Sequence, residues 1–223
     1  MITDDPGTPG NRKWEINLAV AFEHRARETS FDAPAIDLNY GVGENIQLTL
    51  QGGPAWLKRC GRGVIGGLGG TEAAVKWRFR NEEASGFDVS MFPRVIFNLV
   101  QSSVRRGLAM DGTRFQIPFQ VAKTFGRFHA DAEFGPVVGS VGPSEWLYGI
   151  VGGYDVAKAT SLMAELHGSS RINFAGDDVL TTNVGLRRAL SEKRIFIASL
   201  GRELRSPNQP RAFIGYVGMQ LLF

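Results

Sequence analysis

The sequence RAFIGYVGMQLLF, residues 211–223, decides the fold that the rest of the chain must fit. Apolar residues or glycine occupy every second position back from Phe223, through Leu221, Met219 and Val217. A period of two predicts a β-strand with two different faces. In a soluble domain, an exposed strand that ends on an aromatic residue would invite aggregation. The stretch therefore favours a strand that closes a barrel in a lipid bilayer.

The same alternation of apolar and polar residues recurs along the chain. In the stretch 13–24, Trp14 and Ile16 fall on one face while Glu15 and Asn17 fall on the other. About 12 strands are predicted, at 13–24, 33–42, 45–56, 71–80, 87–99, 113–125, 128–138, 144–155, 160–171, 179–190, 194–202 and 211–223. Short links alternate with longer ones, and 57–70 and 100–112 are predicted as long loops. This pattern is typical of an all-β fold, a transmembrane antiparallel up-and-down β-barrel with short periplasmic turns.

Alternating apolar residues with a terminal phenylalanine resemble the C-terminal signature of bacterial outer-membrane β-barrels. The resemblance implies that Phe223, Leu221 and Met219 are an assembly signal and that the barrel assembly machinery is a partner. Three segments are similar to a group of outer-membrane barrels identified as transporter-like, or as the MetA pathway of phenol degradation. These segments are TEAAVKWRF at 71–79, SSVRRGL at 102–108 and FIGYVGMQLLF at 213–223. This second resemblance implies a channel-like barrel.

The composition fits one domain that crosses a membrane with strands. The chain has 223 residues, 28 glycines and a mean hydropathy of -0.09, which suits a barrel because only alternate residues meet lipid. No apolar run approaches the length of a transmembrane helix. We predict a polar lead-in at residues 1–12 and a single transmembrane barrel domain at 13–223. The lead-in lacks an apolar core, so we expect that Met1 stands where a signal peptide was removed and that the protein resides in the bacterial outer membrane.

If the apolar face meets lipid, the opposite face lines the lumen, and its charged side chains are candidate channel residues. The predicted lumen-lining residues are Lys76, Arg78, Arg94 and Arg114 on a basic wall, Asp131, Glu133, Glu165 and His167 on later strands, Glu15, Glu23 and Asp37 on the first two strands, and Arg187. Opposed charged walls would order water and polarise a passing solute. A lattice of salt bridges that fills a narrow barrel and stops flow is an equal alternative.

A second basic group lies on the predicted outer loops and comprises Lys58, Arg59, Arg62, Arg105 and Arg106. These side chains are expected to contact anionic lipopolysaccharide among the outer-membrane lipids. Attraction of anionic solutes is the alternative. Nucleic acid is not an expected partner despite the sequence pI of 9.2, because the chain has no aromatic–basic ladder or binding motif.

An enzymatic interpretation depends on the histidines. A hydrolase triad could be formed by Ser161 or Ser169 with His167 and Glu165. Some outer-membrane barrels hydrolyse lipid. No distinctive nucleophile motif surrounds these residues, which favours a polar ladder in the lumen instead. His129 and His167 are predicted to lie about 14 Å apart in height. This separation argues against a shared metal site, and no cofactor is expected.

These patterns together predict a passive channel or transporter-like protein for small solutes, polar or aromatic. An outer-membrane hydrolase acting on lipid and a plugged barrel without flux are the alternative functions. A soluble antiparallel sandwich or barrel is the alternative fold. The many ionisable groups on the polar face argue against it, and twelve strands in an open sheet would leave two unprotected edges.

Overall fold

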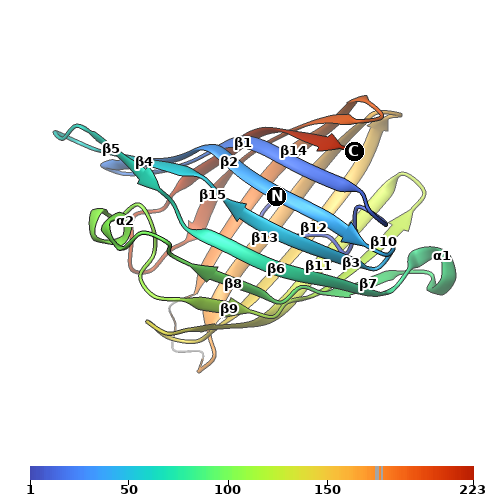
Figure 1. Ribbon diagram of the computed structural model, residues 1–223, viewed down its shortest axis with the longest axis horizontal. Helices are drawn as coiled ribbons and strands as arrows, with labels where there is room; N and C mark the ends of the chain where they lie inside the picture. Colours follow the sequence, from blue (N-terminus) through green and yellow to red (C-terminus); the bar gives the residue numbers. More distant parts are fainter. Residues whose placement is uncertain (174–175, 177) are drawn as a thin grey trace.

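The computed structural model describes residues 1–173, 176 and 178–223, and it is a closed antiparallel β-barrel (Figure 1). The chain passes through the wall twelve times, and the third to sixth passes are each divided into two strands. The strands are β1 (Trp14–Arg25), β2 (Glu28–Val42), β3 (Ile46–Gly52), β4 (Pro54–Arg59), β5 (Val64–Leu68), β6 (Thr71–Arg80), β7 (Asp88–Met91), β8 (Arg94–Phe97), β9 (Arg114–Gln116), β10 (Phe119–Phe125), β11 (Phe128–Gly139), β12 (Glu145–Ala157), β13 (Thr160–Arg171), β14 (Val179–Ser191), β15 (Arg194–Arg205) and β16 (Phe213–Leu222). Two short helices, α1 (Glu82–Ser85) and α2 (Gln101–Arg106), lie in connections. No helix in the described ranges is long and apolar enough to cross a membrane.

β16 closes the barrel against β1, as the pattern at residues 211–223 predicts. The antiparallel ladder begins with Glu15 opposite Leu222. Beside this pair, the backbone N–H groups of Trp14 and Phe223 each donate to the other residue's carbonyl at 3.0 Å. Closure pairs the first strand with the last, so the sheet has no edge at the seam through which chains aggregate.

Most of the short connections lie at one end of the barrel and most of the longer ones at the other (Figure 1). The end with the C-terminus, which we name the turn end, carries the links 43–45, 81–87, 126–127, 158–159 and 192–193. The opposite end, which we name the loop end, carries the two-residue link 26–27 and the longer links 60–63, 98–113, 140–144 and 206–212. The two ends therefore differ in the way that the alternation of short and long links predicts.

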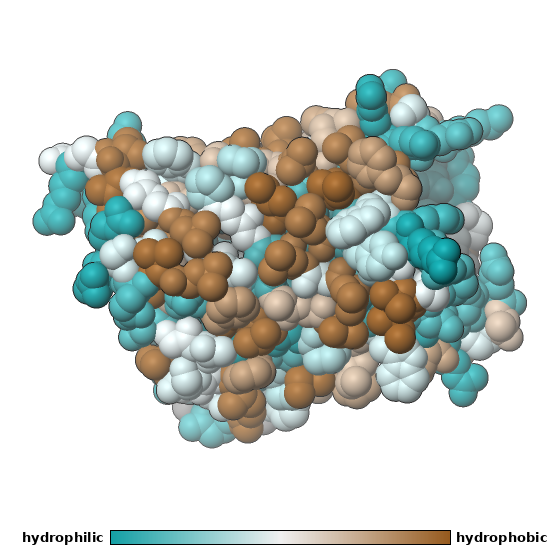
Figure 2. Space-filling model, viewed as in Figure 1, coloured by the Kyte–Doolittle hydropathy of each residue, from teal (hydrophilic) through white to brown (hydrophobic). Residues whose placement is uncertain are grey.

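The outside of the barrel is apolar and the inside is polar. Leu48 and Val75 on paired strands are each 44% exposed, whereas Gln47 and Ala74 beside them are 7% and 8% exposed. Figure 2 shows apolar residues gathered over the middle of the wall, with hydrophilic residues toward the two ends. A soluble protein has the opposite arrangement. The wall is therefore suited to hydrocarbon, and the soluble alternative is wrong.

One of the two predicted long loops is largely strand. Residues 57–70 were expected to be irregular, but β4 runs to Arg59 and β5 follows, so the two form a hairpin. Leu57 of this hairpin is buried against Leu108, which follows α2 in the second predicted loop. The glycine-rich hairpin is thus stabilised by a distant apolar residue, a partner that its own sequence pattern does not indicate.

Two predicted strands are interrupted by proline. Pro93 separates β7 from β8, and Pro118 separates β9 from β10. Proline has no N–H to give to the ladder, which accounts for both breaks. The N–H of Phe92 donates to the carbonyl of Pro118 at 2.9 Å, so the two breaks lie side by side. The buried ring of Phe92 lines the lumen at this level.

Candidate functional site: a lumen occupied by residues 1–12

Residues 1–12, which we name the N-terminal segment, lie inside the barrel. In Figure 1 the N-terminus is seen in the middle of the barrel, far from both ends. Thr3 and Pro6 are buried, and Met1 lines three separate lumen cavities. The sequence pattern predicts only a polar lead-in here and does not indicate that the segment lies in the lumen.

Glu165 of β13 holds the beginning of the N-terminal segment. Its carboxylate accepts the backbone N–H of Ile2 at 3.0 Å and also the N–H of Thr3. Asn183 of the neighbouring strand β14 donates to the same carboxylate. Glu165 is only 3% exposed. Hydrogen bonds to an ionised carboxylate are about twice as strong as neutral ones, which makes Glu165 the first anchor of the segment.

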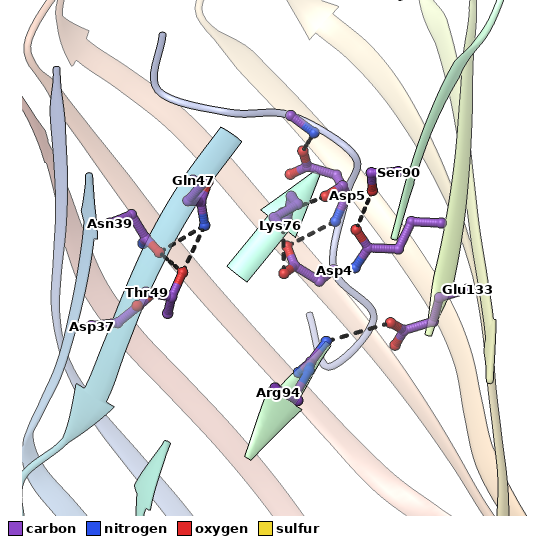
Figure 3. Close-up of polar contacts among 12 residues, drawn as sticks. Asp4, Asp5, Asp37, Asn39, Gln47, Thr49, Lys76, Ser90, Arg94 and Glu133 are labelled. Atoms are coloured by element: carbon purple, nitrogen blue, oxygen red, sulfur yellow. Dashed lines mark hydrogen bonds and ion pairs between the residues drawn. The ribbon is translucent and has the colours of Figure 1, made fainter. Parts of the chain in front are cut away.

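Lys76 of β6 is the second anchor (Figure 3). Its ammonium group donates to the carbonyl of Asp5 at 2.6 Å and lies 3.2 Å from Oδ2 of Asp4. Burial alone would raise the pKa of Asp4, but the positive charges of Lys76 and Arg94 and the hydrogen bonds outweigh it and hold that pKa below its ordinary value. Asp4 is therefore ionised at neutral pH, and the ion pair persists.

The turn end supplies the third contact with the segment. The hydroxyl of Thr8 donates to the carbonyl of Glu44 at 2.7 Å, and the N–H of Arg12 donates to the carbonyl of Gly41 at 2.9 Å. A Cβ atom on Gly41 would lie 1.8 Å from the carbonyl oxygen of Gly10. Glycine at this position of β2 thus allows the N-terminal segment to pass close to the wall.

The segment divides the remaining space in the lumen. A cavity of about 300 Å³ toward the loop end is lined by Phe22, Glu23 and Asp32. A cavity of about 370 Å³ toward the turn end is lined by Glu15 and Asp131, among others. Between them, about 270 Å³ lies beside Asp4, Phe92 and Arg94. The lumen is therefore hollow on both sides of the segment, and the cavity toward the turn end is the more polar of the two.

The predicted basic and acidic walls meet on one side of the barrel. Arg94 lies 3.9 Å from Glu72 and 3.9 Å from Glu133, and Glu133 lies 3.8 Å from His167. Arg78 lies 4.0 Å from Asp88. Neighbouring cations on adjacent strands repel each other unless anions lie beside them. The acid beside Lys76 is Asp4, which comes from the N-terminal segment and which the pattern of strands did not indicate.

The other predicted lumen residues lie apart from this cluster. Asn17 donates to Glu15 at 3.2 Å and to Asp37 at 3.0 Å, and Arg187 donates to Gln220 at 3.1 Å. Toward the loop end, Glu23 and Glu203 both pair with Arg25. Arg114 is half-buried on β9, and Asp131 lines the cavity near the turn end.

Neutral side chains complete the lumen wall. Gln47 donates to Asn39 at 2.8 Å and to Thr49 at 3.0 Å, and Thr49 donates to Asn39 at 2.6 Å (Figure 3). Ser90 donates to Gln120 at 2.7 Å on the facing part of the wall. These bonds fix the side chains of the wall against one another, so the wall keeps its shape independently of the segment.

The predicted basic residues of the outer loops all lie at the loop end but differ in their contacts. Arg59 pairs with Glu28 at 2.6 Å, and Arg106 donates to the carbonyl of Gly66 at 2.8 Å. The remaining three, Lys58, Arg62 and Arg105, are exposed.

The residues of the alternative hydrolase have different partners from those that a triad needs. The hydroxyl of Ser161 donates to Asp155 at 2.6 Å, and Asp155 also lies 3.0 Å from His129. His167 instead lies beside Glu133, and the carboxylate of Glu165 binds the N-terminal segment. The imidazole and the carboxylate proposed for that triad are thus engaged elsewhere.

Comparison with solved structures shows the fold of bacterial outer-membrane barrels. The chain is similar to an outer membrane channel from Pseudomonas putida F1, with a TM-score of 0.77, 16% identity and coverage of 99% of each chain. The KdgM porin matches with a TM-score of 0.64 and 11% identity, over 93% of this chain and 99% of the porin. The translocator domain of the autotransporter NalP from Neisseria meningitidis matches with a TM-score of 0.58 and 12% identity, over 96% of this chain and 89% of the domain. No family model and no curated protein matches the sequence.

Proposed function

We propose that this protein is a channel for passive passage of small solutes across the bacterial outer membrane, and that its N-terminal segment closes it in this conformation. The observation that carries the proposal is a hollow polar lumen interrupted by a segment that is not part of the barrel ladder. The structural neighbours that are named as a channel and a porin support the same function.

The segment is held in a way that permits release. Its anchors at Glu165 and Lys76 are three charge-assisted hydrogen bonds and one ion pair. Such bonds contribute roughly 1.5–3 kcal/mol each, whereas no barrel strand has to separate when residues 1–10 leave. Ordering the backbone of residues 1–10 costs about 1–2 kcal/mol per residue, so the net free-energy gap between the closed and open states is much smaller than the sum of these bonds. The segment therefore suits a gate better than a permanent filling.

The orientation in the membrane follows from the two ends. We place the turn end in the periplasm and the loop end outside, as short and long links are placed in known barrels. The exposed Lys58, Arg62 and Arg105 would then contact phosphate groups of lipopolysaccharide. The barrel assembly machinery would read the strand that ends at Phe223.

Deletion of residues 2–10 tests the proposal. The purified variant and the parent protein are compared in planar bilayers at equal amounts of inserted, heat-modifiable barrel. We expect rare, brief openings from the parent and a sustained larger conductance from the variant, because the anchors at Glu165 and Lys76 are lost. If the deletion variant inserts but stays as silent as the parent, side chains of the wall fill the lumen and the channel function is wrong.

A further inference from the structure

We propose that Lys76 and Arg94, with the ring of Phe92 beside both cations, form a binding site for small organic carboxylates, and that Asp4 occupies this site in the closed conformation. The proposal rests on the channel function and specifies a class of solute for the same lumen. The carboxylate of Asp4 and the carboxylate of a solute would then compete for the same two cations.

The two cations are held together although their charges repel. They project from β6 and β8, which pair with Ala74 opposite Arg94. Nζ of Lys76 lies 4.7 Å and Cζ of Arg94 lies 4.5 Å from the ring centroid of Phe92. Like charges on adjacent strands are destabilising unless an anion compensates them. The carboxylate of Asp4 supplies such an anion at 3.2 Å from Lys76, while Glu72 and Glu133 of the wall lie 3.9 Å from Arg94.

Arg94 has hydrogen-bond donors to spare. Its Nε and Nη2 atoms are buried and have no hydrogen-bond partner among the described residues. The nearest wall carboxylates, on Glu72 and Glu133, are 3.9 Å away, which is beyond hydrogen-bond distance. A guanidinium group presents a planar fork that matches a carboxylate. Both atoms are buried in this conformation, so a free carboxylate can use these donors once the guanidinium group turns toward the cavity.

The space beside this pair accepts the body of a small solute. The cavity of about 270 Å³ is lined by Arg94, Phe92, Ile197 and Tyr216 and by the acidic Asp4, Asp37 and Glu72, whereas Lys76 lines the neighbouring cavity toward the turn end. An engineered protein cavity of about 150 Å³ is enough to hold benzene. The volume of the cavity is therefore sufficient for a solute with a carboxylate and a single ring. Its carboxylate would replace that of Asp4 and loosen the second anchor of the segment.

Benzoate binding to the purified barrel in neutral detergent, measured by calorimetry, tests the site. We expect Asp4→Ala to bind benzoate at least tenfold more tightly than the parent. In the parent, the tethered carboxylate of Asp4 competes with benzoate at a millimolar effective concentration, and the substitution removes this competitor. Asp5→Asn is the matched control, since the side chain of Asp5 accepts the N–H of Gly7 and not the ammonium of Lys76. It should bind benzoate as the parent does. Adding Arg94→Gln to Asp4→Ala should abolish the gain, and benzyl alcohol, which lacks the carboxylate, should show no such gain.

Equal benzoate affinity in Asp4→Ala and the parent would overturn the carboxylate site, and this comparison does not require that the Arg94 variant folds. The same gain in Asp5→Asn, or for benzyl alcohol, would also overturn it. The conductance of the 2–10 deletion variant without benzoate separates the two proposals. If that variant conducts while benzoate fails to bind, the channel stands and the site is wrong. If benzoate binds as predicted and the variant is silent, the site stands and the channel is wrong.

Discussion

At the residue scale, Gly149 of β12 makes room for the N-terminal segment. A Cβ atom at this position would lie 2.1 Å from Oγ1 and 3.1 Å from Cβ of Thr3. No rotation of the Thr3 side chain relieves the contact with its own Cβ. The close approach of Thr3 to the wall thus depends on the absence of a Cβ atom at Gly149.

We predict that Gly149→Ala displaces the segment and raises the open probability in planar bilayers, with little change in barrel stability. Gly153→Ala is the matched control on the same strand, because a Cβ there would meet its nearest neighbours, His129 and Met163, only at 3.5 and 3.6 Å. The alanine at 153 should leave gating unchanged. Parent-like gating in Gly149→Ala would show that the segment adjusts to the wall and that the close fit has no part in closure.

The alternation of residues predicts which way a side chain faces but not what it contacts. Glu165 was expected in the lumen because it alternates with apolar neighbours on its strand, and the structure buries it there. Its partners Ile2 and Thr3 are more than 160 positions away in the sequence. Asp4 was missed for the same reason: nothing in a short polar stretch indicates which buried cation it will meet.

At the element scale, β16 does two things at once. It pairs with both β15 and β1, and its end at Phe223 is tied to Trp14 by backbone bonds in both directions. The side chain of Phe223 is nevertheless 63% exposed, so its ring contributes little to packing within the barrel. An exposed ring at the seam is available to a partner during assembly.

We predict that Phe223→Ala lowers the yield of folded barrel in cells several-fold while refolding in detergent stays close to that of the parent. The substitution keeps the backbone bonds to Trp14 and removes only the ring. Phe213→Ala at the other end of the strand, also exposed, is the control and should reduce neither yield. Comparable losses in cells and in detergent would mean that the ring of Phe223 acts in packing alone.

Whole strands were predictable where alternation is unbroken, and less so where tertiary contacts decide. β11, β12 and β13 lie within a few residues of their predicted bounds because each has one lipid face and one lumen face along its length. The β4–β5 hairpin was missed because glycine and arginine hide its alternation and Leu108, from a later connection, completes its packing. Residues 1–12 have no periodicity at all, so only the folded barrel determines where they lie.

At the scale of the whole molecule, the N-terminal segment changes the charge of the lumen as well as its width. Residues 2–10 include two acidic residues, Asp4 and Asp5, and no basic ones. Removing these residues takes two negative charges out of the lumen, while Lys76, Arg78 and Arg94 remain. The opened barrel should therefore be less selective for cations than a barrel that keeps Asp4 and Asp5, since fixed charges near a narrow path select the opposite sign.

We predict that Arg78→Gln, made in the 2–10 deletion variant, shifts the reversal potential in a salt gradient toward cations. Arg78 suits this test because it lies near the turn end and its ion pair with Asp88 spans 4.0 Å. Its replacement therefore leaves no deeply buried carboxylate without a close cationic partner. Arg188→Gln is the control, because Arg188 alternates onto the outer face of β14 with Val184 and lies outside the path of ions. An equal shift in both variants would mean that surface charge near the membrane sets the selectivity. No shift in either, at normal conductance, would place the path of ions away from the basic wall.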